Sequence, residues 1–401
     1  MSELTSFGLI VLLVGAALSA ALLASKLGAR ASVPAAALFL AAAAIASDVF
    51  PSLSVSIETV ERLGTVALIV ILFDGGSSIG LRRLRSAAAP IAALGILGTF
   101  ATAGLLTLFA HWAFGLGWIT AGLLGAAIAP TDPAVMFSVL GDREIGGRSR
   151  TILEGESGAN DPVGIALMLG MIQLATHADA TFWIVVRVFC EQMAIGLAFG
   201  VVGGLAERRI LERVSLPSSG LSTIRTLALA GLVYGAASVA HGSGFLAVFV
   251  AGVIVGDAEA PFQTEIEAFQ DGLATLAEIV VFVALGLTID LSGIGVERWG
   301  EGLAIATFAA VVARPIAVLP LLAPSTLRRG ERLFITWGGL KGAVPILLAA
   351  FALAQHVADG ERIYELVFVV VLASVVVQGG TISLAARAFG IESRRPGERA
   401  G

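Results

Sequence analysis

Long apolar stretches separated by short polar connections occupy almost the whole chain. Most are close to the roughly 20 residues that an α-helix needs to cross the hydrocarbon core of a bilayer. The pattern predicts an all-α membrane protein with 13 transmembrane helices. The predicted segments are residues 5–26, 33–50, 61–80, 86–112, 117–140, 152–176, 182–205, 221–240, 243–257, 270–290, 299–323, 331–357 and 363–389.

Two connections between segments are long enough to need an interpretation of their own. Residues 206–220 are first charged and then rich in Pro, Ser and Gly, which predicts a surface linker. Residues 257–271 carry five acidic residues and no basic one. That run is either a solvated interfacial loop or an acidic collar that concentrates cations at the mouth of a funnel.

Composition agrees with this class and excludes others. Of the 401 residues, 57% are hydrophobic and 14% are charged, whereas soluble chains average about 25% charged. The mean hydropathy is +0.93. A net charge of −5 gives no basic footprint for a nucleic acid, and the single cysteine, Cys190, excludes a disulfide scaffold. The lipid bilayer is the expected surrounding.

The basic residues indicate an orientation. When alternate connections are assigned to opposite sides, nineteen of the 25 Lys and Arg residues fall on one side, three on the other and three within segments. Cytoplasmic loops carry an excess of Lys and Arg. We therefore predict a multi-pass protein of the cell (plasma) membrane with its N-terminus outside and its C-terminus in the cytoplasm.

The fifth segment contains a sequence that a regular helix does not accommodate. Pro130 and Pro133 lie three residues apart, and each lacks an N–H and clashes with the preceding turn. Between them, Thr131 and Asp132 predict a break, with Asp132 capping a second half-helix that begins at Pro133. The alternative is a kinked helix with a capping aspartate. Unwound backbone at membrane depth is tolerated where it is buried in protein or lines a cavity, which favours a site.

The sixth segment carries two polar stripes at its start. Glu156 and Asn160 are four residues apart and share one face of the helix, and Ser157 and Asp161 share the neighbouring face. Lipid is an unfavourable environment for both stripes. They form either a site or a set of interhelical hydrogen-bond positions.

The eleventh and twelfth segments carry Arg314 and Lys341. Glycines at 338, 339 and 342 weaken the helix around Lys341, which predicts a second break. The two breaks lie seven segments apart, and an odd offset reverses orientation across the membrane. This predicts a single domain (1–401) of two inverted six-helix repeats, 5–176 and 221–389, joined by a linking helix at 182–205 and followed by a short tail at 390–401. Interrupted helices at matching positions of inverted repeats indicate a transporter site at the midplane.

The side chains expected to converge there permit ion chemistry. If a basic residue neutralises Glu156, the other carboxylates form an anionic pocket with the hydroxyls of Thr131 and Ser157. Such hard oxygen donors suit a monovalent cation, and Asp74 at the end of segment three is either part of the pocket or a helix-end residue. Burial favours the protonated form of a carboxylate, whereas a bound cation favours the ionised form. Competition between the two, with alternating access, is sufficient for cation/proton exchange.

These motifs resemble those of the cation:proton antiporter-1 family, the NhaP-type sodium/proton exchangers, and are closest in wording to its potassium/proton members. The matching sequences are TDP at 131–133, ESGANDP at 156–162, ARP at 313–315 and GGLKGAVP at 338–345. The resemblance covers essentially the whole chain. It implies thirteen helices in inverted repeats with crossing broken helices, a homodimer, and an elevator-like movement of the core.

The resemblance also implies roles for individual residues. Asp161 is the implied cation- and proton-binding carboxylate, with Asp132, Ser157 and the Thr131 backbone completing the shell, and Asp74 stands where members carry an acidic residue near the site. Glu156, Asn160 and Arg314 form the implied structural polar cluster, and Lys341 stands where arginine is more usual. Electrogenic relatives carry a second aspartate at the position of Asn160, so electroneutral one-for-one exchange is implied.

The function predicted from the sequence is antiport of Na⁺ or K⁺ against H⁺ without a cofactor. The alternative is a cation channel or uniporter without proton coupling. An intramembrane enzyme is disfavoured because the sequence shows neither metal-ligand spacing nor a nucleophile with its base.

Overall fold

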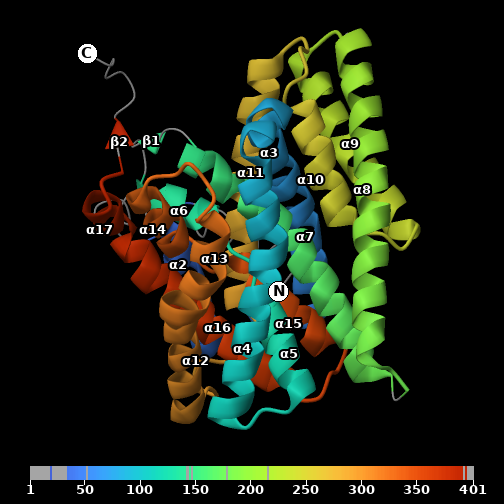
Figure 1. The fold of residues 1–401 in the computed structure, drawn as a ribbon. Coiled ribbons are helices and arrows are strands. Elements are labelled where there is room, and N and C mark those ends of the chain that lie inside the picture. Colours follow the sequence, from blue (N-terminus) through green and yellow to red (C-terminus); the bar gives the residue numbers. More distant parts are fainter. Residues whose placement is uncertain are drawn as a thin grey trace.

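The computed structural model describes residues 19, 34–50, 53–140, 144–145, 148–177, 179–214, 216–391 and 393–394. Its regular elements are helices joined by short connections, with two two-residue strands, β1 (Glu144–Ile145) and β2 (Ser393–Arg394), which pair antiparallel. Most helices run along one common direction, with α8 and α9 on one side and the strands on the other (Figure 1). The predicted segment 5–26 lies outside the described residues.

The elements follow the order of the predicted segments. Where a helix contains a short π-helical stretch, that stretch is labelled η. The helices are α2 (Ala35–Val49), α3 (Ile57–Ala92), η2 (Ala93–Gly98), α4 (Thr99–Phe114), α5 (Trp118–Ile128), α6 (Pro133–Leu140), α7 (Arg148–Thr176), α8 (Phe182–Arg213), α9 (Ser219–Val239), α10 (Gly244–Val255), α11 (Gln263–Gly286), α12 (Val296–Phe308), η3 (Ala309–Ala313), α13 (Arg314–Leu322), α14 (Arg329–Trp337), α15 (Ala343–Ala354), α16 (Gly360–Ala373), η4 (Ser374–Gly379) and α17 (Gly380–Ala388).

Many of these helices are suited to a bilayer. Within the described residues, six helical runs are long and apolar enough to cross a membrane, and four shorter apolar helices accompany them. The long runs are Ile57–Phe114, Phe182–Arg213, Ser219–Val239, Gln263–Gly286, Val296–Leu322 and Gly360–Ala388. Each predicted segment from the second to the thirteenth corresponds to one helix, part of one, or a pair of half-helices.

The longest run is two crossings rather than one. Its 58 residues would extend about 87 Å as a straight helix at 1.5 Å per residue, far more than the thickness of a bilayer. Gly80 interrupts it with φ 65° and ψ 161°, a backbone conformation essentially restricted to glycine. The Asp257 carboxylate accepts the backbone N–H of Arg82 at 2.8 Å and so satisfies a donor just after the break. The boundary predicted between segments three and four is therefore at Gly80.

Two predicted connections are partly helical. Residues 206–213 continue α8 as a helix, so the prediction of a linker beginning at 206 was wrong. Its charges pair along the helix, with Arg208 and Glu212 in a salt bridge of 2.8 Å, which stabilises an exposed turn. The acidic run is also only partly a loop, because α11 begins at Gln263. Glu265 lies in its first turn, where the helix dipole favours negative charge.

The interior is built around α7, α15 and α16. From Gly155 to Met168, α7 is almost entirely buried, and it packs against α3, α5 and α8. Glycine permits this close approach, since a Cβ on Gly158 would overlap the ring of Phe249 in α10. The helix that carries both polar stripes therefore lies in the core, where its polar groups must find protein partners or a ligand.

Candidate functional site

The predicted break in the fifth segment is present. Helix α5 ends at Ile128 and α6 begins at Pro133, so four residues leave the helix inside the membrane-spanning part. The two prolines explain the interruption, because neither supplies an N–H to continue the hydrogen-bond ladder. The exposed carbonyls of α5 and the first amides of α6 then need partners from elsewhere in the fold.

Helix α7 holds Thr131, at the centre of this break, by three hydrogen bonds. The Ser157 hydroxyl donates to the Thr131 carbonyl at 2.7 Å. The Asn160 amide donates to the Thr131 hydroxyl at 2.8 Å and accepts the Thr131 N–H at 3.3 Å. One residue of each stripe predicted on α7, Asn160 and Ser157, therefore binds the unwound stretch, as expected for polar groups buried away from water.

The second predicted break is also present and meets the first. Helix α14 ends at Trp337 and α15 begins at Ala343. The Asp132 N–H donates to the carbonyl of Leu340 at 2.8 Å, which joins the two unwound stretches directly. The Lys341 ammonium donates to the carbonyls of Ala129 and Pro130 at 3.0 and 3.1 Å. A cation is favourable there, because these two carbonyls directly follow the C-terminus of α5, which is the negative end of its dipole.

Side chains of η4 form hydrogen bonds with the backbone of the unwound stretch around Lys341. The Ser374 hydroxyl accepts the Lys341 N–H at 2.9 Å and donates to the Gln378 side chain at 2.7 Å. The Gln378 amide in turn donates to the carbonyl of Trp337 at 3.3 Å. The sequence analysis missed Ser374 and Gln378. Their spacing was the available signal in the sequence, because two polar residues four positions apart in an apolar segment share one helix face.

Asp132 lies at the start of two half-helices. It directly precedes Pro133, the first residue of α6, and its carboxylate packs so closely on Gly342 that a Cβ there would overlap it. Gly342 directly precedes α15. Helix N-termini present unpaired amides and a positive dipole end, which favour a carboxylate. Position 342 therefore requires glycine, because any side chain there would displace the Asp132 carboxylate.

Asp161 is a buried carboxylate with unused capacity for a ligand. It is 5% exposed, and its Oδ1 has no hydrogen-bond partner within the described part of the chain. Asp132 and Lys341 are its electrostatic neighbours. A buried carboxylate oxygen without a donor is costly unless it binds a proton or a cation.

The adjacent acid is neutralised instead. Arg314 and Glu156, 4% and 1% exposed, form a buried bidentate pair in which both guanidinium Nη atoms donate to the carboxylate. Bidentate geometry is the strongest form of such pairing. The condition stated in the sequence analysis, that a basic residue neutralises Glu156, is therefore met by Arg314, whereas Lys341 binds the carbonyls of Ala129 and Pro130.

One further carboxylate, on another helix, belongs to the electrostatic surroundings of Asp132. Glu278 in α11 lies within electrostatic range of Asp132. The sequence analysis left Glu278 without a role, although an acidic residue in the apolar stretch ATLAEIVVF was a signal in itself.

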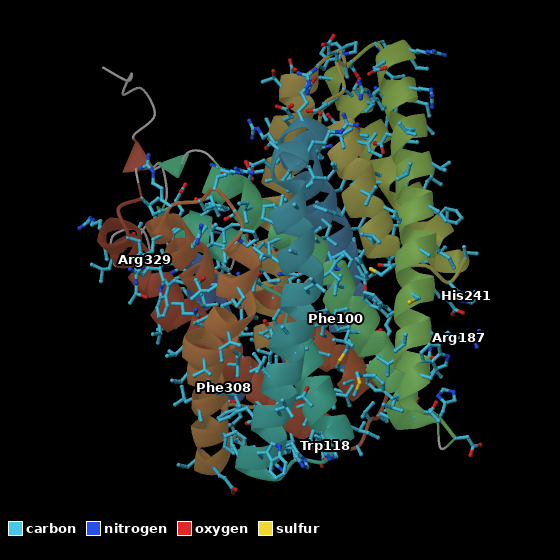
Figure 2. The ribbon with its side chains drawn as sticks, viewed as in Figure 1. Phe100, Trp118, Arg187, His241, Phe308 and Arg329 are labelled. Atoms are coloured by element: carbon cyan, nitrogen blue, oxygen red, sulfur yellow. The ribbon has the colours of Figure 1, made fainter. Side chains whose placement is uncertain are left out.

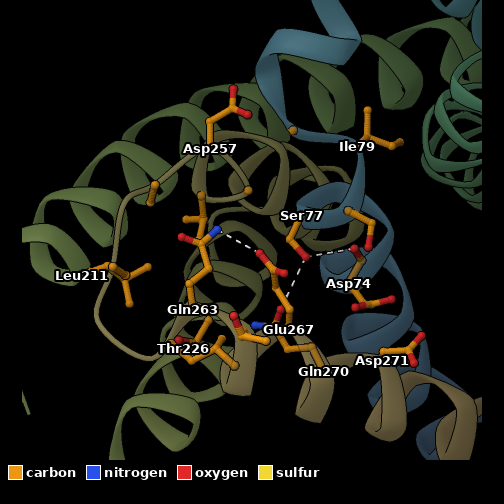
Figure 3. Close-up of a pocket in the computed structure, with 18 of the residues that line it drawn as sticks. Asp74, Ser77, Ile79, Leu211, Thr226, Asp257, Gln263, Glu267, Gln270 and Asp271 are labelled. Carbon is orange, nitrogen blue, oxygen red and sulfur yellow. Dashed lines mark hydrogen bonds between the residues drawn. The ribbon is translucent and has the colours of Figure 1, made fainter. Parts of the chain in front are cut away.

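The structure places Asp74 in a separate cavity rather than beside Asp161. This cavity has a volume of about 780 Å³ and is also lined by Asp257, Glu267 and Asp271 (Figure 3). The charged neighbours of Asp74 are Asp271 and Glu154. Arg82 and Arg83 line the cavity too, so it is of mixed charge with an acidic excess.

Eight of the nine residues singled out in the sequence therefore belong to one connected cluster, and Asp74 does not contact it. The members of the cluster are Thr131, Asp132, Glu156, Ser157, Asn160, Asp161, Arg314 and Lys341. Within the described residues, no group of three or more His, Cys, Asp or Glu could hold a metal ion.

The fold and this cluster define a multi-pass membrane protein with buried charges at the meeting point of two broken helices. Residues 10–388 match the family described as sodium/hydrogen exchanger, transmembrane. The chain belongs to this family, which consists of monovalent cation/proton antiporters, and it is thus classed with transporters rather than enzymes. The resemblance stated from the motifs is confirmed.

Relatives with assigned names are also cation/proton antiporters. The chain is 38% identical to the K(+)/H(+) antiporter NhaP of Alkalimonas amylolytica over 332 aligned residues. The alignment covers 82% of this chain and 58% of that protein. It is 32% identical to the K(+)/H(+) antiporter NhaP2 of Shewanella oneidensis, over 95% of this chain and 67% of the relative. The chain thus spans little more than half the length of the Alkalimonas relative.

A solved structure has the same fold. The sodium proton antiporter MjNhaP1 from Methanocaldococcus jannaschii superimposes with a TM-score of 0.79, at 23% identity, covering 94% of this chain and all of the other. At this identity the similarity establishes the fold and leaves the substrate to be argued from the site.

Proposed function

We propose that this protein exchanges K⁺ or Na⁺ for H⁺ at Asp161. The observation that carries the proposal is the buried Asp161 Oδ1, which has no donor among the described residues, beside Asp132 and at the meeting point of the two breaks. The named relatives support this class of substrate, since two are K(+)/H(+) antiporters and one, from Halobacillus dabanensis, is a Na(+)/H(+) antiporter.

The mechanism needs only competition for one carboxylate. Burial favours the protonated form of a carboxylate, and a bound cation favours the ionised form. We assign the remaining hard oxygen donors of the cation's shell to Asp132, Ser157 and Thr131. Glu156 is held by Arg314 and therefore takes no part in the exchange. Each access change then carries either a proton or a cation on Asp161.

The stoichiometry follows from the charge count. Asn160 is neutral and commits its amide to Thr131, so Asp161 is the one carboxylate that alternates between a proton and a cation, while Asp132 contributes oxygen to the cation's shell. One cation is exchanged for one proton, and the cycle is electroneutral.

Alternating access uses the repeated architecture. The two inverted six-helix repeats, residues 5–176 and 221–389 joined by the helix that begins at 182, place the two breaks at one midplane site. The core that carries this site moves like an elevator within a homodimer. The N-terminus is outside and the C-terminus is cytoplasmic in the plasma membrane. The acidic excess of the Asp74 cavity attracts cations on the cytoplasmic side.

The test is proton movement in proteoliposomes with an imposed pH gradient. Addition of K⁺ or Na⁺ dequenches a pH-sensitive dye for the unmodified protein, and Asp161→Asn abolishes the response. Asp179→Asn is the matched control, because Asp179 is exposed in the connection between α7 and α8, and it retains full exchange. Full exchange by Asp161→Asn would refute the proposal.

The same preparation separates an antiporter from a channel. A channel would pass cations under an imposed voltage without any change of internal pH. Apparent affinities for Na⁺, K⁺ and Li⁺ across pH then identify the preferred cation.

A further inference from the structure

A carboxylate in the membrane-spanning helix α11 has no basic partner among the described residues. Glu278 lies in the apolar second half of this helix, is half-buried and takes part in none of the salt bridges of the described part of the chain. Arg187 shows how such a charge is usually neutralised, since it projects from α8 (Figure 2) and pairs with Glu191 of its own helix at 2.8 Å. An ionisable side chain at membrane depth without such a partner indicates a function.

Glu278 continues an acidic stripe that begins in the Asp74 cavity. Glu267 and Asp271 of α11 line that cavity (Figure 3). Asp271 follows Glu267 by four residues, and Glu278 follows Asp271 by seven, so the three carboxylates share one face of the helix. Seven residues are two turns, or about 10.5 Å along the helix axis. The stripe therefore leads from the cavity to a deeper level in the membrane-spanning part.

The deep end of the stripe reaches the ion site. Helix α11 packs against α15, which begins directly after Gly342, the glycine in contact with the Asp132 carboxylate. Glu278 and Asp132 are electrostatic neighbours. The buried Asp161 Oδ1, which has no partner within the described residues, shows that capacity for a ligand remains at this level.

Helix α7 repeats the seven-residue spacing, and two acidic levels result. The outer level, at the cavity, consists of Asp74, Glu154 and Asp271. The inner level, at the ion site, consists of Asp132, Asp161 and Glu278. On both α7 and α11 the step from one level to the other is seven residues. Within the inner level, Asp161 is 5% exposed and Glu278 is only half-buried, so Glu278 is the more accessible of the two.

We propose that Glu278 is a further cation-binding residue, through which K⁺ or Na⁺ passes between the Asp74 cavity and Asp161. The inference rests on the proposed function, because it takes Asp161 as the carboxylate that exchanges the cation for a proton. A negative charge attracts a cation over several ångströms in a protein, so Glu278 raises the cation concentration beside Asp161. Glu278 returns to its starting charge after each passage, and the exchange therefore stays one-for-one.

Substitutions in α11 provide a matched set. Glu278→Gln removes the charge and keeps the size of the side chain, whereas Glu278→Asp keeps the charge. Glu265→Gln is the control, because Glu265 is exposed and is not among the described residues that line the cavity. It precedes Glu278 by thirteen positions and therefore faces roughly the opposite side of the helix.

The experiment measures the exchange rate against the concentration of K⁺ or Na⁺ in membrane vesicles of both orientations, with a pH-sensitive dye as the readout. An impermeant maleimide identifies the vesicles that expose the cavity, because it labels Thr264→Cys at the cavity wall in a Cys190→Ser background.

The expected effect is confined to one side of the membrane. With the cation supplied on the cavity side, Glu278→Gln raises the apparent KM about tenfold, the scale of one charge interaction near a protein surface, and keeps the rate at saturating cation. Glu278→Asp recovers part of the affinity, and Glu265→Gln behaves as the unmodified protein. With the cation supplied on the other side, the KM of Glu278→Gln is unchanged.

Three results would overturn the inference: an unchanged KM for Glu278→Gln on the cavity side, an equal rise on both sides, or a loss of rate at saturating cation that Glu278→Asp does not recover. Asp271→Asn, at the exposed outer level, should raise the KM on the same side and decides the question if Glu278→Gln does not fold. Asp161→Asn keeps the two proposals apart. If that variant is inactive while the KM of Glu278→Gln is normal, only the role of Glu278 fails.

Discussion

The ammonium group of Lys341 lies 3.1 Å from the carbonyl oxygen of Pro130. The residues are 211 positions apart and belong to the two different broken helices. The same ammonium also binds the carbonyl of Ala129, so one positive charge satisfies the exposed end of α5 and fixes it to the second break. The two breaks are thus one structural unit.

Removal of that ammonium should destabilise the protein. Lys341→Met leaves two buried carbonyls without a donor, and an unsatisfied buried polar group costs roughly 1–3 kcal/mol. We expect a lower midpoint of thermal unfolding in detergent and a large loss of exchange. Arg187→Met in α8 is the control, because that side chain is exposed and pairs only with the exposed Glu191. An unchanged midpoint for Lys341→Met would show that water satisfies the carbonyls.

Glu156→Gln should lower the stability of the folded protein by more than the loss of one buried hydrogen-bond acceptor would. It leaves the Arg314 charge buried without its counter-ion, and breaking a buried pair typically costs about 3–5 kcal/mol. The unfolding midpoint in detergent should fall strongly, and Glu156→Gln combined with Arg314→Met should recover part of the loss. The same change in an exposed pair, Glu191→Gln, should have little effect. No recovery in the double variant would mean that Arg314 has a second role.

Gly342→Ala tests the close contact with Asp132. The added methyl group overlaps the carboxylate, so either Asp132 or the start of α15 must move. We expect exchange to fall sharply and the apparent affinity for the cation to weaken in proteoliposomes. Gly300→Ala in α12 meets nothing within 4 Å, and should retain exchange with slightly greater stability, because alanine is the better helix former. Normal exchange by Gly342→Ala would exclude a role for Asp132 in ion binding.

Electroneutral exchange is tested separately. A one-for-one cycle moves no net charge, so an inside-negative potential set by a permeant ion should leave the initial rate of exchange unchanged at fixed pH and cation gradients. Clear acceleration by the potential would show that more than one proton is exchanged for each cation. Asp161→Asn liposomes provide the baseline for leak.

The local features of this protein were readable in its sequence. Apolar length predicted the crossings, and the spacing of Pro130 and Pro133 and the glycines around Lys341 predicted both breaks, because each depends on neighbouring residues. The linker prediction failed at 206–213 for a related reason. The Arg208–Glu212 salt bridge supports the last turns of α8, and charge alone did not distinguish an exposed helix from a loop.

The partners of the buried charges could not be predicted from local sequence. The residues by themselves did not say which base neutralises Glu156, and only the family resemblance grouped Arg314 with it. The tertiary structure pairs Arg314 with Glu156 and binds Lys341 to the carbonyls of Ala129 and Pro130. It also placed Asp74 in a cavity of its own and brought in Ser374, Gln378 and Glu278. Periodicity determines which residues share a face of one helix, but which faces meet depends on packing between helices far apart in the chain. The sequence by itself therefore determined the class of the protein and the location of its breaks. Only the packing of those helices decided that one oxygen of Asp161 has no hydrogen-bond partner among the described residues.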